Sequence, residues 1–248
     1  MIDKDLKSLK YRMTDTNNFR PERVSQSDNS IVVENVSLVE AHFREIEKVI
    51  VDKISLSEAV VGCVAWLTSY AVLDALAELK GGCSIVLQKE DYLRPDVDHT
   101  PTSYKTVRNK YALLTALAPY SYGEFQKSTL EYLDDGGEIA DIAIRCVGYR
   151  RMAGKVHPIM HHKFLVFLKS EGCGYSPKPY AVWTGSFNMS INATLSLENG
   201  LFVESEELAN AYFNEWYNTL MISEELDWKA DTPQPTIQYN ILDSNVVP

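Results

Sequence analysis

Five residues in the second half of the chain form a set that can act on a phosphodiester. His161 and Lys163 lie in Met-His-His-Lys-Phe, Ser186 and Asn188 follow in Gly-Ser-Phe-Asn, and Glu198 comes later. An imidazole can attack phosphorus, while ammonium, hydroxyl and amide groups can hold the non-bridging oxygens and a carboxylate can orient the imidazole. The set therefore predicts phosphodiester chemistry for which no metal ligands are needed.

The elements around these residues predict how they are positioned. The apolar runs 164–168 and 180–184 are typical of buried strands, and 199–203 is a third run of this kind. If the first two strands are neighbours, the polar residues at their ends lie on one rim of a sheet. The sequence therefore predicts a site at a strand edge.

The run contains two histidines, and the alternation of a strand separates them. Side chains two residues apart in a strand share a face, so His161 points the same way as Lys163 and His162 points the other way. Ser186 and Asn188 share a face for the same reason. His162 is the rival for the catalytic role, and face parity favours His161.

In order and spacing, these residues resemble the signature of the phospholipase D superfamily. That signature is His-x-Lys-x4-Asp, followed by Gly-Ser-x-Asn and a glutamate roughly a dozen residues on. The resemblance covers roughly residues 40–222 and includes a strand–helix–strand unit in residues 59–93, in which Ser69 is a candidate helix N-cap. The chain departs from the signature at Leu168, where the family has a mostly structural Asp, so we expect altered local geometry more than altered chemistry.

The resemblance implies an active site in which two histidines have different roles. In the family, two His-x-Lys units face each other; one His forms a phosphohistidine, and the other protonates the leaving oxygen and then activates water. This chain has one unit, so a homodimer with the site on its two-fold axis is implied. His161 would attack, Lys163, Ser186 and Asn188 would stabilise the phosphoryl oxygens, and Glu198 would fix the tautomer of His161. No metal and no cofactor are implied.

The predicted fold class is α/β, a phospholipase D-like mixed sheet with helices on both faces and one motif per chain. Residues 1–30 are expected to be a polar tail, 31–222 the catalytic domain with a probable insertion at 94–138, and 223–248 a second tail. Apolar spacing predicts helices over 38–51, 70–79, 104–117, 125–133 and 207–221. Strands are predicted over 59–67, 83–88 and 139–147 in addition to the motif strands.

Composition limits the class of protein. The chain has 248 residues and a net charge of −10, and no apolar run approaches the ~20 residues that cross a bilayer. The N-terminus lacks the apolar core of a signal peptide, so a cytoplasmic location without a membrane is expected. A basic segment nevertheless leads into the motif, and we expect it to bind the anionic substrate through Arg150, Arg151, Lys155 and His157. A solvated basic loop is the structural alternative.

These observations favour a metal-independent nuclease that cuts DNA or RNA. They also allow a separate protein partner that sets its specificity or regulates it. A phospholipase or phosphatidyltransferase is one alternative, although no interfacial amphipathic helix is evident. A catalytically decayed dimer that binds nucleic acid is the other, with Leu168 as the mark of decay. Tyrosines in 94–138 suit either stacking on bases or ordinary packing.

Overall fold

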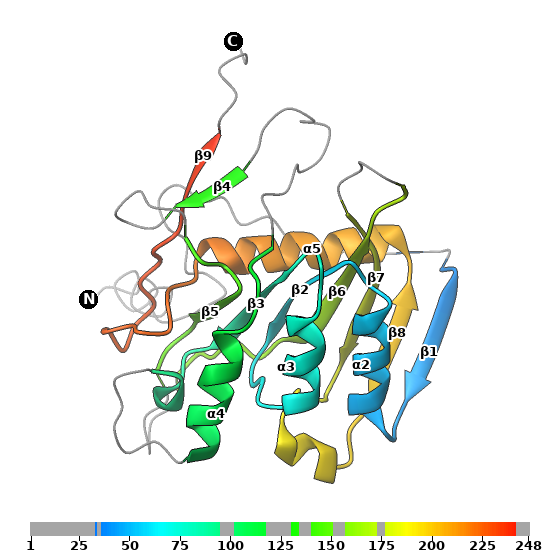
Figure 1. Cartoon of the computed structure of the whole chain (residues 1–248), viewed down its shortest axis with the longest axis horizontal. Helices are drawn as coiled ribbons and strands as arrows, with labels where there is room; N and C mark the ends of the chain where they lie inside the picture. Colours follow the sequence, from blue (N-terminus) through cyan, green and yellow to red (C-terminus); the bar gives the residue numbers. More distant parts are fainter. Residues whose placement is uncertain are drawn as a thin grey trace, which may run out of the picture.

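Apolar strands from both halves of the chain build one mixed sheet (Figure 1). The computed structural model describes residues 33, 36–94, 102–117, 130–133, 140–150, 157–172 and 177–241. The seven strands lie in the order β1 (Leu38–His42), β8 (Gly200–Glu204), β7 (Lys178–Gly185), β6 (Lys163–Lys169), β2 (Ala59–Val64), β3 (Cys83–Gln88) and β5 (Ile144–Val147). The pairs β2–β3 and β3–β5 are parallel and the other four are antiparallel.

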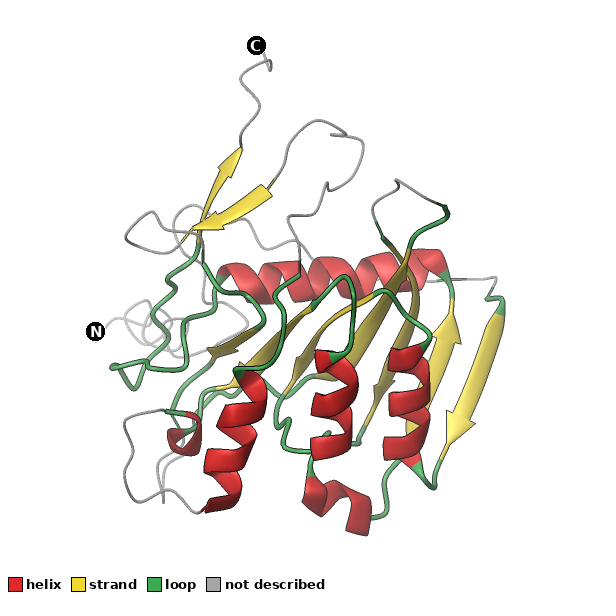
Figure 2. Ribbon diagram, in the orientation of Figure 1, coloured by secondary structure: helices red, strands yellow, loops and turns green. Residues whose placement is uncertain are grey.

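Helices cover both faces of this sheet, which confirms the predicted fold class (Figure 2). One face carries α2 (Ile46–Ser55), α3 (Tyr70–Ala77) and α4 (Thr102–Tyr111), and the other carries α5 (Glu206–Met221). Short 3-10 turns, η2 (Asp91–Leu93) and η3 (Ile191–Leu195), lie in the connections. Ser69 is the N-cap of α3, because its hydroxyl oxygen accepts a hydrogen bond from the Val72 amide at 3.2 Å.

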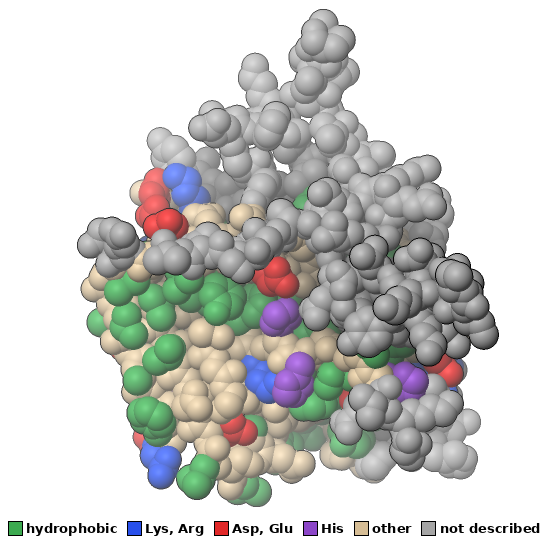
Figure 3. Space-filling view, turned by 180° about the vertical axis from the view of Figure 1, so that it is seen from behind, with side chains coloured by type: hydrophobic (Ala, Val, Ile, Leu, Met, Phe, Trp, Pro, Cys, Tyr) green, Lys and Arg blue, Asp and Glu red, His purple; other side chains and the backbone are tan. Residues whose placement is uncertain are grey.

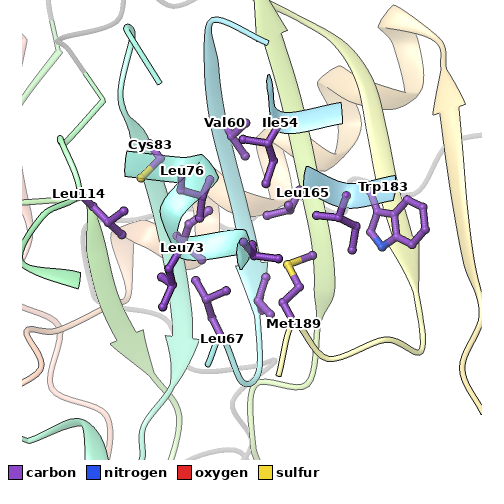
Figure 4. Close-up of a cluster of buried hydrophobic side chains, with 14 of the residues drawn as sticks. Ile54, Val60, Leu67, Leu73, Leu76, Cys83, Leu114, Leu165, Trp183 and Met189 are labelled. Carbon is purple, nitrogen blue, oxygen red and sulfur yellow. The ribbon is translucent and has the colours of Figure 1, made fainter. Parts of the chain in front are cut away.

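The sheet separates two cores because successive strand residues point to opposite faces. In β6, Leu165 packs under α2 and α3 with Trp183 of β7 (Figure 4). Val166 instead packs under α5 with Trp216. Both faces are buried, so β6 reads as a continuous apolar run and not as an alternating one. Among the described residues, no helix has the length and apolar character to cross a membrane.

The helix expected over 38–51 is wrong in its first part. Residues 38–42 form β1, which pairs with β8 in antiparallel register, and the helix runs from Ile46 to Ser55. The apolar spacing of the segment fits a helix, but residues 38–42 have an open sheet edge beside them. Pairing with that edge satisfies their backbone groups, and tertiary context overrides the local pattern.

Residues 130–133 also differ from expectation. They form the strand β4 (Leu130–Leu133) where a helix over 125–133 was predicted, and they pair with β9 (Gln238–Ile241) in a separate two-stranded sheet. The partner strand lies more than a hundred residues further along the chain, so the pairing has no local signature. The rest of the segment, 125–129, lies outside the described residues.

The segment after α5, expected to be a tail, packs against the body of the protein. Glu224 forms an ion pair with Lys89 at 2.5 Å, and both side chains are almost completely buried. Lys89 also donates to the carbonyls of Ala230 and Thr232, and Trp228 is buried over its ammonium group. The expected N-terminal tail, 1–30, lies outside the described residues.

Candidate active site

The start of β6 and the end of β7 lie side by side. Their antiparallel register pairs Phe164 with Thr184, so Lys163 on one strand and Gly185 on the next are at the same edge of the sheet. Gly185 allows a third strand to come close, since a Cβ there would lie 2.3 Å from the Asn199 carbonyl oxygen. The two segments of the motif and the start of β8 therefore meet at one rim.

Lys163 is a buried lysine with its ammonium group at this rim. The residue is 8% exposed, and its Nζ donates to the His161 carbonyl at 3.0 Å and lies 5.8 Å from the centre of the Trp66 ring. Burial lowers the pKa of Lys163, and the Glu198 carboxylate opposes that shift. A cation held in this setting is suited to binding a phosphoryl oxygen.

The two histidines of the motif directly precede β6 and have different neighbours. The His161 ring is exposed and meets the Trp66 ring edge-on, with centroids 5.5 Å apart, so it shares a neighbour with Lys163. The His162 ring instead pairs with Glu215 of α5 at 3.3 Å and packs edge-on against Phe164. These neighbours agree with the alternation inferred from the sequence, and His161 is the histidine that shares the Trp66 ring with Lys163.

Ser186 and Glu198 are hydrogen-bonded to each other. The Ser186 hydroxyl donates to the Glu198 carboxylate and accepts from the Asn199 amide at 3.1 Å, while the Ser186 amide donates to the Asn199 carbonyl at 3.0 Å. The family resemblance assigns Glu198 to the imidazole of His161, and that role stays a prediction. In the structure the Glu198 carboxylate also accepts from Ser186 and acts electrostatically on Lys163.

Asn188 lies in the turn that leaves β7. Phe187 and Met189, on either side of it, are buried, and the Met189 carbonyl accepts from the amides of Thr68 and Ser69 at 2.8 and 2.9 Å. The turn is thereby fixed to the start of α3. The Asn188 Oδ1 atom is buried without a hydrogen-bond partner in the described part of the chain. It is an acceptor free for a ligand.

A pocket of about 410 Å³ opens beside these residues, and we call it the rim pocket. Its lining includes three aromatic rings, two carboxylates and an amide, from Trp66, Tyr92, Tyr104, Glu90, Glu198 and Asn188. The sequence missed Trp66 and Glu90 as site residues. Both follow strands that end at this edge, β2 and β3, and that position is the signal that could have identified them.

In the described part of the basic lead-in, the charge of Arg150 is neutralised by two carboxylates. Arg150 pairs with Asp91 at 2.9 Å and Asp231 at 3.2 Å, and these carboxylates raise its pKa. His157 stacks on Tyr149 with a ring angle of 8°, and its Nε2 is buried without a partner among the described residues. Arg151 and Lys155 lie outside the described residues.

The position of the signature Asp is part of the core. Leu168 is fully buried near the end of β6, paired with Ala59 of β2 and packed in the cluster under α5. The register of β6 against β7 shifts between Phe167 and Leu168. A carboxylate here would be buried among apolar groups, so this chain uses the position for packing.

The described surface shows where charged groups gather. On the face turned away from Figure 1, histidine, basic and acidic side chains lie close together near the middle of the molecule (Figure 3). Within the described ranges, no three His, Cys, Asp or Glu side chains are arranged to hold a metal ion.

A relative in a giant virus identifies the family. The chain is 30% identical over 215 residues to an uncharacterized protein, L381, of Acanthamoeba polyphaga mimivirus, and the match covers 83% of this chain and 70% of the relative. The chain therefore belongs to the family of this mimivirus protein. No protein-family model matches the chain.

Three solved structures are similar in chain path. The first is a phospholipase D family member, Nuc, from Salmonella typhimurium, with a TM-score of 0.44 and 15% identity; the match covers 75% of this chain and 96% of Nuc. The second is NucT from Helicobacter pylori, with a TM-score of 0.46 and 13% identity, where the match covers 76% of this chain and 98% of NucT. The third is phosphatidylserine synthase from Haemophilus influenzae Rd KW20, with a TM-score of 0.39 and 13% identity, where the match covers 76% of this chain and 40% of the synthase.

Proposed function

We propose that the protein is a metal-independent phosphodiesterase of the phospholipase D superfamily, and most specifically a nuclease for DNA or RNA. The observation that carries this proposal is the grouping of His161 and Lys163 around one tryptophan ring, at the sheet edge that also carries Ser186, Asn188 and Glu198. The set supplies a nucleophile, a cation and hydrogen-bonding groups for a phosphate.

The proposed reaction has two displacements at phosphorus. An imidazole nitrogen of His161 forms a bond to phosphorus as the bond to the leaving oxygen breaks, and the leaving oxygen takes a proton from a second imidazole. That imidazole then removes a proton from water, whose oxygen displaces His161. Lys163 and Asn188 hold the non-bridging oxygens, and Glu198 keeps the Ser186 hydroxyl and the Lys163 ammonium group in place.

The second imidazole would come from a second copy of the chain in a homodimer, because the sequence has one His-x-Lys unit. Exposed leucines next to the site support a contact there. Leu195 and Leu197, three residues and one residue before Glu198, are 87% and 86% exposed, and Ile191 and Leu201 are also exposed. Large apolar side chains grouped along an exposed segment are typical of an interface.

Nucleic acid is favoured over lipid as the substrate because three aromatic rings line the rim pocket beside the site. Aromatic rings stack on nucleobases, whereas a lipid substrate needs an apolar surface that enters a bilayer. The proposed roles of Arg150, Arg151, Lys155 and His157 are to bind the phosphates of the polymer. For Arg150, this requires release from Asp91 or Asp231.

Cleavage in the absence of metal tests this function. Labelled single- and double-stranded DNA and RNA are incubated with the protein in excess EDTA, next to the His161→Ala variant and the matched control His162→Ala. We expect cleavage that survives EDTA, falls by at least about a thousandfold in His161→Ala and persists in His162→Ala. Dependence on a divalent cation would contradict the mechanism. Hydrolysis of phospholipid vesicles without cleavage of any nucleic acid would replace the nuclease by the lipid enzyme.

A further inference from the structure

We propose that the rim pocket binds the nucleobase next to the scissile phosphate and prefers bases with an exocyclic amino group. The inference rests on the proposed function, and it assigns to the pocket a role in choosing the cleavage position. Adenine, cytosine and guanine carry such an amino group, while thymine and uracil offer one ring N–H as their donor.

The pocket and the catalytic residues share a wall. The Trp66 ring lines the pocket and also contacts His161, edge-on, and the Lys163 ammonium group. Asn188 and Glu198 belong to both places as well. A phosphate held by His161 and Lys163 therefore has the pocket beside it, within the reach of its own nucleoside.

One wall of the pocket is a flat aromatic platform. Tyr92 and Tyr104 stack with centroids 4.3 Å apart and planes 24° from parallel. Arg108 of α4 donates to the Tyr92 carbonyl at 3.1 Å and so ties η2 to the helix that carries Tyr104. A rigid pair of stacked rings is a surface on which a further planar ring can stack, and all bases have such a ring.

The charged groups of the pocket are acceptors only, although its lining also includes hydroxyl and amide groups that can donate. No lysine or arginine is present among the described residues that line it, whereas Glu90 and Glu198 are carboxylates. The Asn188 Oδ1 is a buried acceptor without a partner among the described residues. Two carboxylates repel a second phosphate, so the pocket is not a backbone site. They favour a ligand with N–H donors, and an exocyclic amino group supplies two. The Glu90 carboxylate also accepts from the Trp66 indole N–H at 3.1 Å, which fixes it in the pocket wall.

A quaternary ammonium head group is the other ligand that aromatic rings and carboxylates attract. The geometry argues against it here. Two of the three rings are stacked on each other, so they do not form separate walls of a cage, and the Trp66 ring already has the Lys163 ammonium group 5.8 Å from its centre. A second cation over that ring would face like-charge repulsion, whereas a neutral base would not.

Single-stranded oligonucleotides of one length test the proposal, with adenine, cytosine, thymine or no base at each sugar. We expect kcat/KM to be about tenfold higher for adenine or cytosine than for thymine, and lowest for the abasic strand. Tyr104→Ala should bring the ratio of intact to abasic strands toward one, and the matched variant Tyr104→Phe should keep it. Glu90→Gln should reduce the preference for adenine and cytosine over thymine.

Equilibrium dialysis of dAMP, deoxyribose 5-phosphate and phosphocholine against the intact protein gives a readout that does not need turnover. Binding of dAMP that weakens at least fivefold in Tyr104→Ala supports the subsite even if no polymer is cut, in which case only the proposed nuclease fails. Equal cleavage of intact and abasic strands overturns the subsite and leaves the nuclease standing. Preferential binding of phosphocholine overturns the base assignment.

Discussion

At Lys163, burial and a neighbouring charge act in opposite directions on one ammonium group. Removal from water lowers the pKa of Lys163, and the Glu198 carboxylate raises it. The carboxylate also accepts the Ser186 hydroxyl hydrogen bond. Glu198 therefore favours the charged form of Lys163 and accepts the hydrogen bond of the Ser186 hydroxyl.

This balance predicts the alkaline limit of activity. In the proposed mechanism the charged form of Lys163 holds the phosphoryl oxygens, so kcat/KM should fall as pH rises through the lowered pKa of Lys163, below the ordinary value of 10.5. Glu198→Gln removes the charge that favours the ammonium form, so the falling limb should move to lower pH. The measurement is a pH profile of kcat/KM for both proteins, judged by the position of the limb and not by its height.

An unmoved limb in Glu198→Gln would contradict the electrostatic role of Glu198. Ser186→Ala is the matched control, because it removes the hydroxyl bonded to Glu198 and leaves the carboxylate charge in place. Its limb should stay at the wild-type position even if its rate is lower. A limb that moves equally in both variants would point to a loss of geometry instead of a loss of charge.

The placement of single side chains can be predicted from the sequence where it depends only on neighbouring residues. The alternation of a strand assigns His161 and His162 to opposite faces, and the structure agrees through Trp66 on one side and Glu215 on the other. Strand alternation does not identify Trp66 or Glu90 as site residues, because their place beside the site depends on where β2 and β3 lie in the sheet. Leu168 is a third case, in which a motif position has become part of the core.

Elements whose pattern is satisfied locally are also well predicted, and those completed by distant partners are not. The run 83–88 forms β3 as predicted, and α5 covers 206–221 with Phe213, Trp216 and Leu220 buried. The segment 38–42 is a strand because β8 is beside it, and 223–237 is packed because Lys89 binds Glu224. The spacing of apolar residues within each segment does not reveal either β8 or Lys89 as the partner.

The Lys89–Glu224 pair predicts how the segment after α5 is anchored. Glu224→Gln leaves the buried Lys89 ammonium group without its carboxylate, and we expect the free energy of unfolding to fall by about 3–5 kcal/mol. Lys89→Met combined with Glu224→Leu removes both charges, so it should cost less than the single change. Denaturant unfolding gives both values. A double variant as unstable as the single one would mean that the attraction itself carries the anchoring.

At the scale of the whole molecule, the proposed mechanism makes the oligomeric state part of the chemistry. It needs two histidines, one for the covalent step and one for the two proton transfers, and one chain has a single His-x-Lys unit. In the proposed homodimer, the exposed Leu195 and Leu197 near Glu198 contribute to the contact between the two copies. A monomer would then fold normally and lack activity.

Mixing of subunits tests this shared site. Wild-type protein is mixed with an equal amount of His161→Ala under conditions that exchange subunits, and cleavage is measured per wild-type subunit. If both histidines are needed in one site, random pairing leaves about a quarter of the dimers fully wild type, and activity per wild-type subunit falls to about half. Mixing with His162→Ala, whose histidine pairs with Glu215 away from the site, should leave it unchanged. Unchanged activity with His161→Ala would mean that each chain carries a complete site of its own, and the homodimer would then be unnecessary for catalysis.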